Sequence, residues 1–274
     1  MGMALLAHLA AHDFGYLSTE RLLRRLSASL DSMNALERYQ QHFYNWYDTQ
    51  TLLPMRPHYI STVDSGNLAG LLLTLRAGLV QVPNKPLFDL SVVNGLRDTL
   101  NTLGEIPAAS DLIKPLHAVF KQVAKTPGAP ALLTLLQNAR SIVAATPAST
   151  EGDITYWQQA FAAQCDDWIA ALDRYQLPAP LIGHEPRRQT LRELAQLNND
   201  DWPIEHHVRI AAVRNAASET INVLVRLIKL TGSLAQMNFA FLYDSKRDLF
   251  FIGYNAEERR LDSGYYDLLL PRYA

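Results

Sequence analysis

The feature that most constrains the fold is a series of amphipathic segments that end at proline-rich breaks. Apolar residues recur at intervals of three or four over most of the chain, which is the spacing of one buried helix face. Proline removes a backbone donor and restricts the residue before it, so each break ends a helix. The segments that we expect to be helical are 22–33, 68–79, 87–103, 109–123, 131–145, 154–175, 187–197 and 205–231. The breaks between them lie at 83–86, 107, 127–130, 147 and 178–180.

A change in the residue pattern near the C-terminus, from helical periodicity to short aromatic-rich runs, predicts a β-hairpin. Two apolar runs rich in aromatic residues, Phe239–Asp244 and Leu249–Asn255, flank the polar stretch Ser245–Asp248. Two such runs joined by a short polar turn are typical of a hairpin. The rest of the chain shows no alternation of strands and helices. We therefore expect an all-α fold of antiparallel helical pairs, as one domain over residues 1–274, with the hairpin at about 239–255.

Composition indicates a globular chain and excludes several classes of function. Of the 274 residues 48% are hydrophobic, which is enough to bury a full core. The net charge is -2 and the basic residues are scattered, so we expect no nucleic-acid partner. No apolar run is long enough to cross a bilayer, so we expect no membrane insertion by this segment. The single cysteine, Cys165, is typical of a reducing compartment, and we expect a cytoplasmic location.

Motifs for cofactors and metals are absent from the sequence. It contains no P-loop, no glycine-rich dinucleotide fingerprint and no Gly-x-Ser-x-Gly elbow. His206 and His207 are adjacent on an expected helix and so point about 100° apart. His8 and His12 have helical spacing but lack a third ligand. We therefore expect neither a cofactor nor a bound metal ion.

The first strong functional signal is a polar-aromatic block, HFYNWYDTQT, at His42–Thr51. It places Tyr44, Asn45, Trp46 and Asp48 in an expected loop. An aromatic ring can stack on the C–H face of a sugar, while amides and carboxylates hydrogen-bond to its hydroxyl groups. These four residues are therefore candidate saccharide ligands. The simpler alternative is that the aromatic side chains only pin the loop to the core.

A second block, STVDSGNLAG at Ser61–Gly70, precedes an apolar helix. Asp64 or Ser65 could cap a helix that begins near Asn67. Capping alone leaves Asn67 and the small Gly66 unexplained. Asp64 and Asn67 are therefore candidate saccharide ligands, with capping as the alternative role.

A third block, which includes the expected hairpin, repeats the Asp-Ser-Gly theme of the second at Asp262–Gly264. Tyr243, Asp244 and Arg247 lie at the hairpin turn, and Tyr266 follows the repeated motif. Charged residues at a turn are usually only solvated, and the tyrosines could belong to the core. The candidate saccharide ligands from this block are Tyr243, Asp244, Arg247, Asp262 and Tyr266.

Together the blocks resemble the central region of bacterial cyclic β-1,2-glucan synthases, the part grouped with glucoamylase-like glycoside hydrolases. The resemblance rests on HFYNWYDTQT, STVDSGNLAG, the FLYD…RDLFFIGYN hairpin and LDSGYYDLL, in that order. It extends over nearly the whole chain and is weak between about 81 and 196. It implies an (α/α)6 toroid whose loops line a β-1,2-glucan groove for chain cleavage and transglycosylation. In the family, the full-length proteins are attached to the bacterial inner membrane.

Glycosidic chemistry needs two carboxylates. The resemblance implies that the catalytic carboxylates follow the point where this chain stops. We therefore expect a fragment, inactive alone, that forms part of the toroid. Its expected partners are a β-glucan oligosaccharide and the remainder of the parent polypeptide.

Two alternatives remain open at this stage. The chain could be a complete hydrolase that takes its acid pair from Asp48, Asp64, Asp244 or Asp262. It could instead be a helical interaction or scaffold domain without catalytic activity, in which the polar-aromatic blocks only brace loops.

Overall fold

The computed structural model describes residues 1–121, 128–146, 152–178 and 189–266, and most of them are helical. The expected helical majority is therefore confirmed. Contacts divide the chain into two compact units. Unit 1 consists of Met1–Leu6, Leu26–Gly78 and Arg226–Ala274, and unit 2 consists of Ala7–Arg25 and Leu79–Val225. The helices that contribute residues to both units are α1 (Gly2–Asp13), α2 (Thr19–Ala35), α3 (Thr62–Gln81) and α9 (His207–Ala235).

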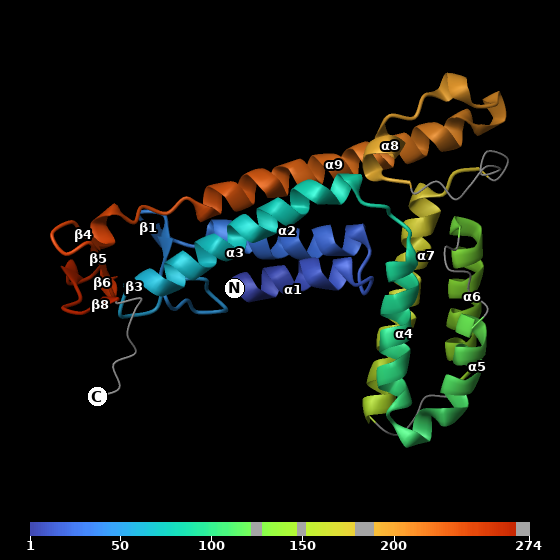
Figure 1. Ribbon diagram of the computed structural model, residues 1–274, viewed down its shortest axis with the longest axis horizontal. Coiled ribbons are helices and arrows are strands. Elements are labelled where there is room, and N and C mark those ends of the chain that lie inside the picture. The colour runs from blue at the N-terminus through green and yellow to red at the C-terminus, as the bar shows by residue number, and fades with distance from the viewer. Residues whose placement is uncertain (122–127, 147–151, 179–188, 267–274) are drawn as a thin grey trace. The chain divides into compact units, whose positions relative to one another are not determined.

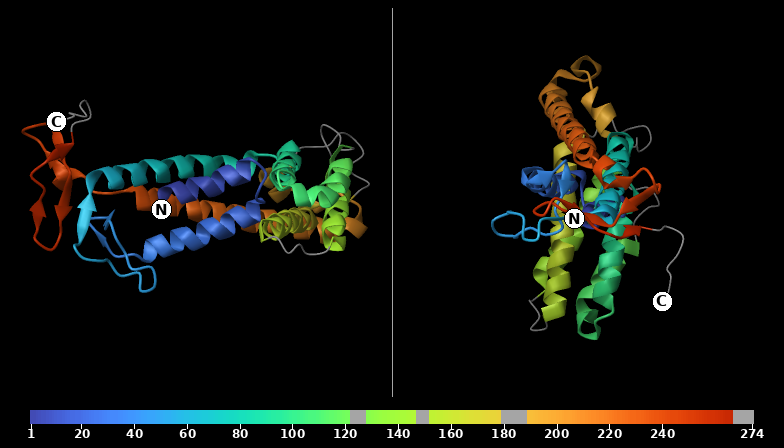
Figure 2. Two further views of the ribbon diagram at one scale, coloured as in Figure 1. Left: turned by 90° about the horizontal axis from the view of Figure 1, so that it is seen from below. Right: turned by 90° about the vertical axis from the view of Figure 1, so that its left-hand side faces the viewer.

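Unit 2 has its core among four helices that lie side by side in Figures 1 and 2. They are α4 (Leu90–Gly104), α5 (Ser110–Lys121), α6 (Ala129–Ala145) and α7 (Gly152–Tyr175). Leu96, Leu116 and Phe161 are fully buried in this core. Cys165 is also buried here, and burial raises the pKa of its thiol to about 12. The cysteine is thus a small core residue, as its sequence context suggests.

Short helices complete unit 2. They are η1 (Val82–Asn84), η2 (Pro107–Ala109), α8 (Leu191–Ala195), η4 (Asn199–Asp201) and η5 (Ile204–His206). Thr190 and Glu193 form a capping box at the start of α8. This helix is shorter than the expected 187–197, and the first two residues of that range lie outside the described residues.

The connection between α1 and α2 packs closely against α4 and α7. Gly15 has a φ of 78°, and its carbonyl accepts hydrogen bonds from Gln164 Nε2 and Trp168 Nε1, both at 3.1 Å. A Cβ atom on Gly95 would lie 2.5 Å from that same carbonyl oxygen. Ser18 then caps α2, because its Oγ accepts from the Arg21 N–H at 3.2 Å. The absence of a side chain at residue 95 lets the connection approach α4.

Unit 1 combines parts of the four shared helices with all of the strands that the structure describes. Arg226 on α9 pairs with Asp31 on α2 at 2.6 Å. Helix α3 begins at Thr62, five residues before the expected start near Asn67. Ser61 caps it, because its Oγ accepts from the Asp64 N–H at 3.2 Å. The prediction that Asp64 or Ser65 caps this helix is therefore wrong, because both residues lie inside its first turns.

The strands of unit 1 form three small antiparallel sheets (Figure 1). Strands β1 (Arg38–Tyr39) and β2 (His42–Phe43) pair with each other. The second sheet has the order β3 (Tyr59–Ser61), β6 (Gly253–Asn255), β7 (Arg260–Leu261). The third has the order β4 (Tyr243–Asp244), β5 (Leu249–Phe251), β8 (Tyr265–Tyr266), and η6 (Ala240–Leu242) precedes it. The run 249–255 thus divides between two sheets, whereas one continuous strand was expected.

A buried histidine ties three segments of unit 1 together. His42 Nε2 donates to the Asn238 carbonyl at 2.8 Å, so Nδ1 is the acceptor for the Ser65 hydroxyl at 2.9 Å. The rings of Phe239 and Phe241 meet the imidazole edge-on. Burial lowers the pKa of His42 from its usual 6.5, because the charged form would be poorly solvated.

Two glycine substitutions should have opposite effects on stability. Gly95→Ala forces a side chain into the Gly15 carbonyl, and we expect it to destabilise unit 2 by about 1–3 kcal/mol. Gly66→Ala meets nothing within 4 Å on α3, and we expect a gain of about 0.5–1 kcal/mol. Urea unfolding followed by circular dichroism measures both. Equal destabilisation by the two variants would contradict this packing.

Acid should weaken the contacts that the buried His42 makes with Ser65 and the Asn238 carbonyl. The pKa of His42 is lower in the folded chain, so as the pH falls the unfolded chain takes up a proton first, near pH 6.5. The stability that His42 contributes is therefore present above pH 6.5 and is lost as the pH falls. We expect the difference in unfolding free energy between the wild type and His42→Gln to shrink from pH 7.5 to pH 5. The pKa of His8 is also lowered by burial, so the variant difference is needed to isolate His42. A difference that is independent of pH would contradict the buried neutral imidazole.

Candidate functional site

A cavity of about 400 Å³ in unit 1 brings the first two polar-aromatic blocks together. Its lining residues are Met1, Gly2, Met3, Phe43, Tyr44, Asn45, Trp46, Asp64, Ser65, Asn67, Leu68, Leu71 and Met237. Five of the candidate ligands are among them: Tyr44, Asn45 and Trp46 from the loop after β2, and Asp64 and Asn67 from the first turns of α3.

The loop after β2 is held to β3 by backbone and amide contacts. The Asn45 N–H donates to the Tyr59 carbonyl at 2.9 Å, and Asn45 Oδ1 accepts from the Ser61 N–H at 3.2 Å. The Trp46 carbonyl accepts from the Met55 N–H at 2.9 Å. These bonds fix the backbone of the loop and leave the Trp46 indole 49% exposed at the cavity. A half-exposed indole on a fixed backbone is a surface on which a flat ligand can stack.

Tyr44 has a structural role as well as a place in the lining. Its side chain is buried with Ile60 and Leu242, and its ring lies 5.1 Å from that of His58. The Tyr44 N–H donates to the Tyr47 hydroxyl, which in turn donates to the Glu37 carbonyl. Tyr44 therefore pins the loop to the core, as the simpler alternative proposed.

Asp48 lies outside the cavity lining. Its Oδ1 accepts from the Gln50 and Thr51 N–H groups at 2.8 and 2.7 Å. The N–H of Thr51, followed by that of Gln50, lowers the pKa of this carboxyl. The carboxylate thus closes its own turn and is not brought to the other candidate ligands.

Tyr59, which is not one of the predicted saccharide ligands, is the central residue of a second cluster. Its hydroxyl donates to Asp262 Oδ2, although the two residues lie 203 positions apart. Burial, and then Asp262, raise the pKa of Tyr59, and Tyr266 and Asp64 raise it further. These four side chains are therefore electrostatic neighbours. The Tyr59 ring also lies 6.4 Å from the Trp46 ring, at 32°, which continues the aromatic surface.

The sheet β3–β6–β7 creates this cluster. Ser61 pairs with Gly253 and Tyr59 with Asn255, while Asp262 directly follows β7. A Cβ atom on Gly253 would lie 2.2 Å from the Tyr59 hydroxyl oxygen and 2.5 Å from the Ile60 carbonyl oxygen. Glycine is therefore required for β6 to approach β3. Strand β3 has only three residues, and both Ile60 and Ser61 are buried, so the sequence carries no alternation that could have identified Tyr59.

The remaining candidates form a separate cluster at the β4–β5 turn. Asp244 accepts from the Lys246 N–H and from the Tyr265 hydroxyl, both at 2.9 Å, and its pKa is lowered by these bonds. The Arg247 guanidinium lies 4.7 Å from the centre of the Tyr265 ring. The Tyr243 hydroxyl donates to Asp248 at 2.9 Å. Contacts within the turn and with Tyr265 on β8 thus occupy Tyr243, Asp244 and Arg247.

Within the described ranges, no group of three or more histidine, cysteine, aspartate or glutamate side chains could hold a metal ion. No helix in the part of the chain that the structure describes is long and apolar enough to cross a membrane. The cluster offers aromatic faces, amides and two carboxylates, Asp64 and Asp262, which is a set of groups suited to a polyhydroxylated ligand.

The contact between Gly253 and Tyr59 can be tested by a double-mutant cycle. Gly253→Ala should cost about 1–3 kcal/mol of unfolding free energy, because the new methyl group displaces the Tyr59 hydroxyl. In a Tyr59→Phe background the oxygen is gone and part of the clash is relieved, so the same change should cost less. Chemical denaturation of the four proteins measures the coupling. Strictly additive costs would show that the new methyl group does not displace the Tyr59 hydroxyl.

Comparison with known proteins shows one relative and no family model. The chain is 27% identical, over an alignment of 282 residues, to the cyclic beta-(1,2)-glucan synthase NdvB of Rhizobium meliloti (strain 1021). The alignment covers 98% of this chain and 9% of that protein, so the chain spans about a tenth of its relative. No protein-family model matches the sequence. The chain is thus similar over nearly its whole length to one segment of a cyclic β-(1,2)-glucan synthase, and the resemblance predicted from its motifs is confirmed.

Proposed function

We propose that this chain is part of a carbohydrate-active domain, of the glycoside hydrolase or transglycosylase type, and that it binds β-1,2-glucan. The observation that carries the proposal is the half-exposed Trp46 indole, which lies on one cavity with Asp64 and Asn67. The similarity to a cyclic β-(1,2)-glucan synthase supports the choice of glucan. The β-glucan oligosaccharide is accordingly the small-molecule partner that we assign to the site.

The groups at the cavity match the chemistry of a glucose unit. The Trp46 ring offers an apolar face for the C–H face of the sugar. Asp64 and Asn67 are exposed on α3 and offer an acceptor and an amide to the hydroxyl groups. The contacts of Asn45 with β3 hold the loop in place before the ligand arrives, which lowers the entropy lost on binding.

Cleavage requires more than this chain, in our proposal. Glycosidases use two carboxyl groups roughly 5–9.5 Å apart, across a cleft that holds the glycosidic bond. Asp262 is engaged by the Tyr59 hydroxyl, and Asp48 and Asp244 close turns. We propose that the catalytic carboxylates come from the remainder of a longer polypeptide. With this chain they would form one domain, an (α/α)6 toroid, on the cytoplasmic side of the membrane.

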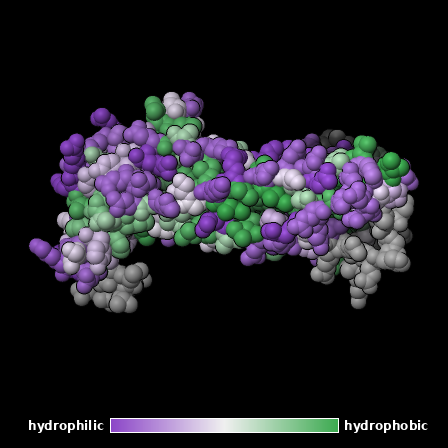
Figure 3. Space-filling model, turned by 90° about the horizontal axis from the view of Figure 1, so that it is seen from above, coloured by the Kyte–Doolittle hydropathy of each residue, from purple (hydrophilic) through white to green (hydrophobic). Residues whose placement is uncertain are grey.

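An alternative function is a helical scaffold, and one observation favours it. Helix α3 carries exposed apolar side chains, with Val63 40% and Leu73 53% exposed, beside the open surface of Gly66 and Gly70. Figure 3 shows apolar side chains (green) gathered over parts of the helical surface. Exposed apolar surface of this kind often binds another protein segment. The scaffold role would leave the Trp46 cavity without a ligand.

Sugar binding at Trp46 distinguishes the two functions. In the 274-residue chain, we expect β-1,2-glucooligosaccharides at millimolar concentration to shift the indole N–H resonance of Trp46. The Trp46→Phe variant, which lacks this resonance, assigns it. Asn67→Ala should weaken this binding about 3- to 10-fold, because it removes one hydrogen-bonding side chain. Leu53→Ala is the matched control, since Leu53 is exposed in the same loop but does not line the cavity. An unmoved Trp46 resonance at tens of millimolar sugar would favour the scaffold.

A further inference from the structure

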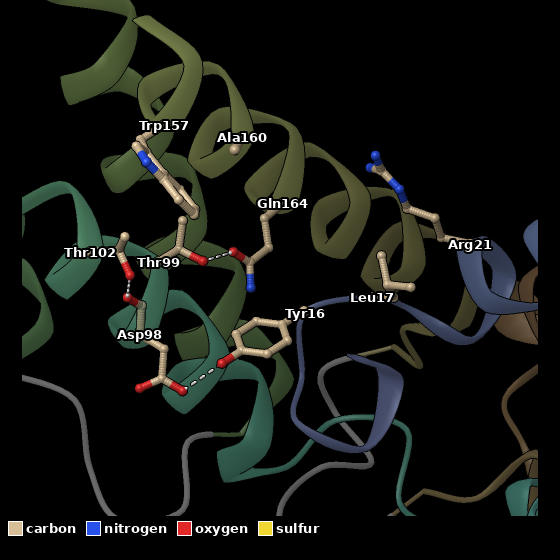
Figure 4. A pocket seen from close by; sticks show the side chains of 9 residues that line it. All are labelled: Tyr16, Leu17, Arg21, Asp98, Thr99, Thr102, Trp157, Ala160 and Gln164. Carbon is tan, nitrogen blue, oxygen red and sulfur yellow. Dashed lines mark hydrogen bonds between the residues drawn. The ribbon is translucent and has the colours of Figure 1, made fainter. Parts of the chain in front are cut away.

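We propose that unit 2 carries a second, separate binding site, which takes a small neutral saccharide. The site is a cavity of about 340 Å³, lined by residues of the α1–α2 connection and the start of α2, of α4 and of α7 (Figure 4). Its side chains include Tyr16, Arg21, Asp98, Trp157 and Gln164. None of them belongs to the three polar-aromatic blocks. The cavity therefore does not depend on the function proposed for unit 1.

Hydrogen bonds hold the walls of this cavity in place. The Tyr16 hydroxyl donates to Asp98 Oδ2 at 3.0 Å, and the Thr99 hydroxyl donates to Gln164 Oε1 at 2.8 Å. Gln164 Nε2 in turn donates to the Gly15 carbonyl at 3.1 Å. In Figure 4 the Thr99–Gln164 pair lies between the Trp157 ring and the Tyr16 ring. Hydrogen bonds within the protein thus hold these walls, which is typical of a binding site that is largely pre-formed.

Several polar groups of the lining remain available to a ligand. Among the described residues, none donates to the second oxygen of Asp98 or accepts from the Trp157 indole N–H. Within the described part of the chain, Arg21 donates through Nη1 alone, to the Ala163 carbonyl at 3.3 Å. A guanidinium group has five N–H donors, so most of those of Arg21 stay free. The cavity therefore offers both donors and acceptors.

The balance of these groups identifies the class of ligand. One carboxylate, Asp98, and one guanidinium, Arg21, roughly cancel in charge, so the lining favours a neutral molecule over an anion or a cation. The rings of Tyr16 and Trp157 offer apolar faces, while the threonine and glutamine side chains suit hydroxyl groups. The volume lies near the lower end of the range of roughly 300–1,000 Å³ for ligand pockets. A mono- or disaccharide meets all three conditions.

The indole resonances of the four tryptophans provide the test, because Trp157 reports this site and Trp46 reports the cavity of unit 1. We expect titration with glucose, β-1,2-glucobiose or cellobiose to shift the Trp157 resonance saturably, both in the wild type and in Trp46→Ala. Ala160→Phe fills the cavity from α7 and should weaken this binding at least about tenfold. Asp98→Asn keeps the shape of the side chain but removes its charge, and should weaken binding about threefold or more.

The outcomes separate this proposal from the one for unit 1. A shift of Trp46 without a shift of Trp157, at tens of millimolar sugar, would overturn the second site and leave the first intact. A shift of the Trp157 resonance without a shift of the Trp46 resonance would support the site in unit 2 and overturn sugar binding in unit 1. If Ala160→Phe and Asp98→Asn both keep native circular dichroism and bind as the wild type does, the cavity is not the site, and the proposal is overturned.

Discussion

The candidate site of unit 1 depends on the pairing of β3 with β6. This pairing sets Ser61 against Gly253 and so joins segments that are far apart in the chain. Strands of two or three residues are marginal alone, so the buried cluster of Tyr44, Ile60 and Leu242 must stabilise the sheet. The approach is possible only because residue 253 has no side chain, which leaves room for the Tyr59 hydroxyl. Asp262 then reaches Tyr59 from the end of β7.

Buried hydrogen bonds keep the same region rigid. His42 is fully buried and links Ser65 on α3 to the Asn238 carbonyl, while Tyr47 satisfies the Tyr44 N–H. An unsatisfied polar group at these positions would cost about 1–3 kcal/mol, so the network strongly favours one arrangement of the loop. A ligand that stacks on Trp46 would meet a surface whose backbone is already ordered, which favours affinity without new contacts.

The structure assigns different roles to carboxylates that look alike in the sequence. Asp48 and Asp244 both cap their own turns, and backbone N–H groups hold their pKa values below the ordinary range. Asp64 is exposed on the first turn of α3, at the end of a helix where a negative charge is favourable. Asp262 is bonded to Tyr59. Because their surroundings differ, Asp64 is the one of these four carboxylates that lines the Trp46 cavity.

The sequence by itself determined the helices and the polar-aromatic motifs, because both are local. Apolar periodicity located α4, α6 and α7 to within about three residues. Only the tertiary structure decided that Ser61 caps α3, that the run 249–255 divides between two sheets, and that Tyr59 meets Asp262. The pairing of short strands that lie more than 190 residues apart leaves little local pattern, because it depends on a buried cluster and on the space beside one glycine.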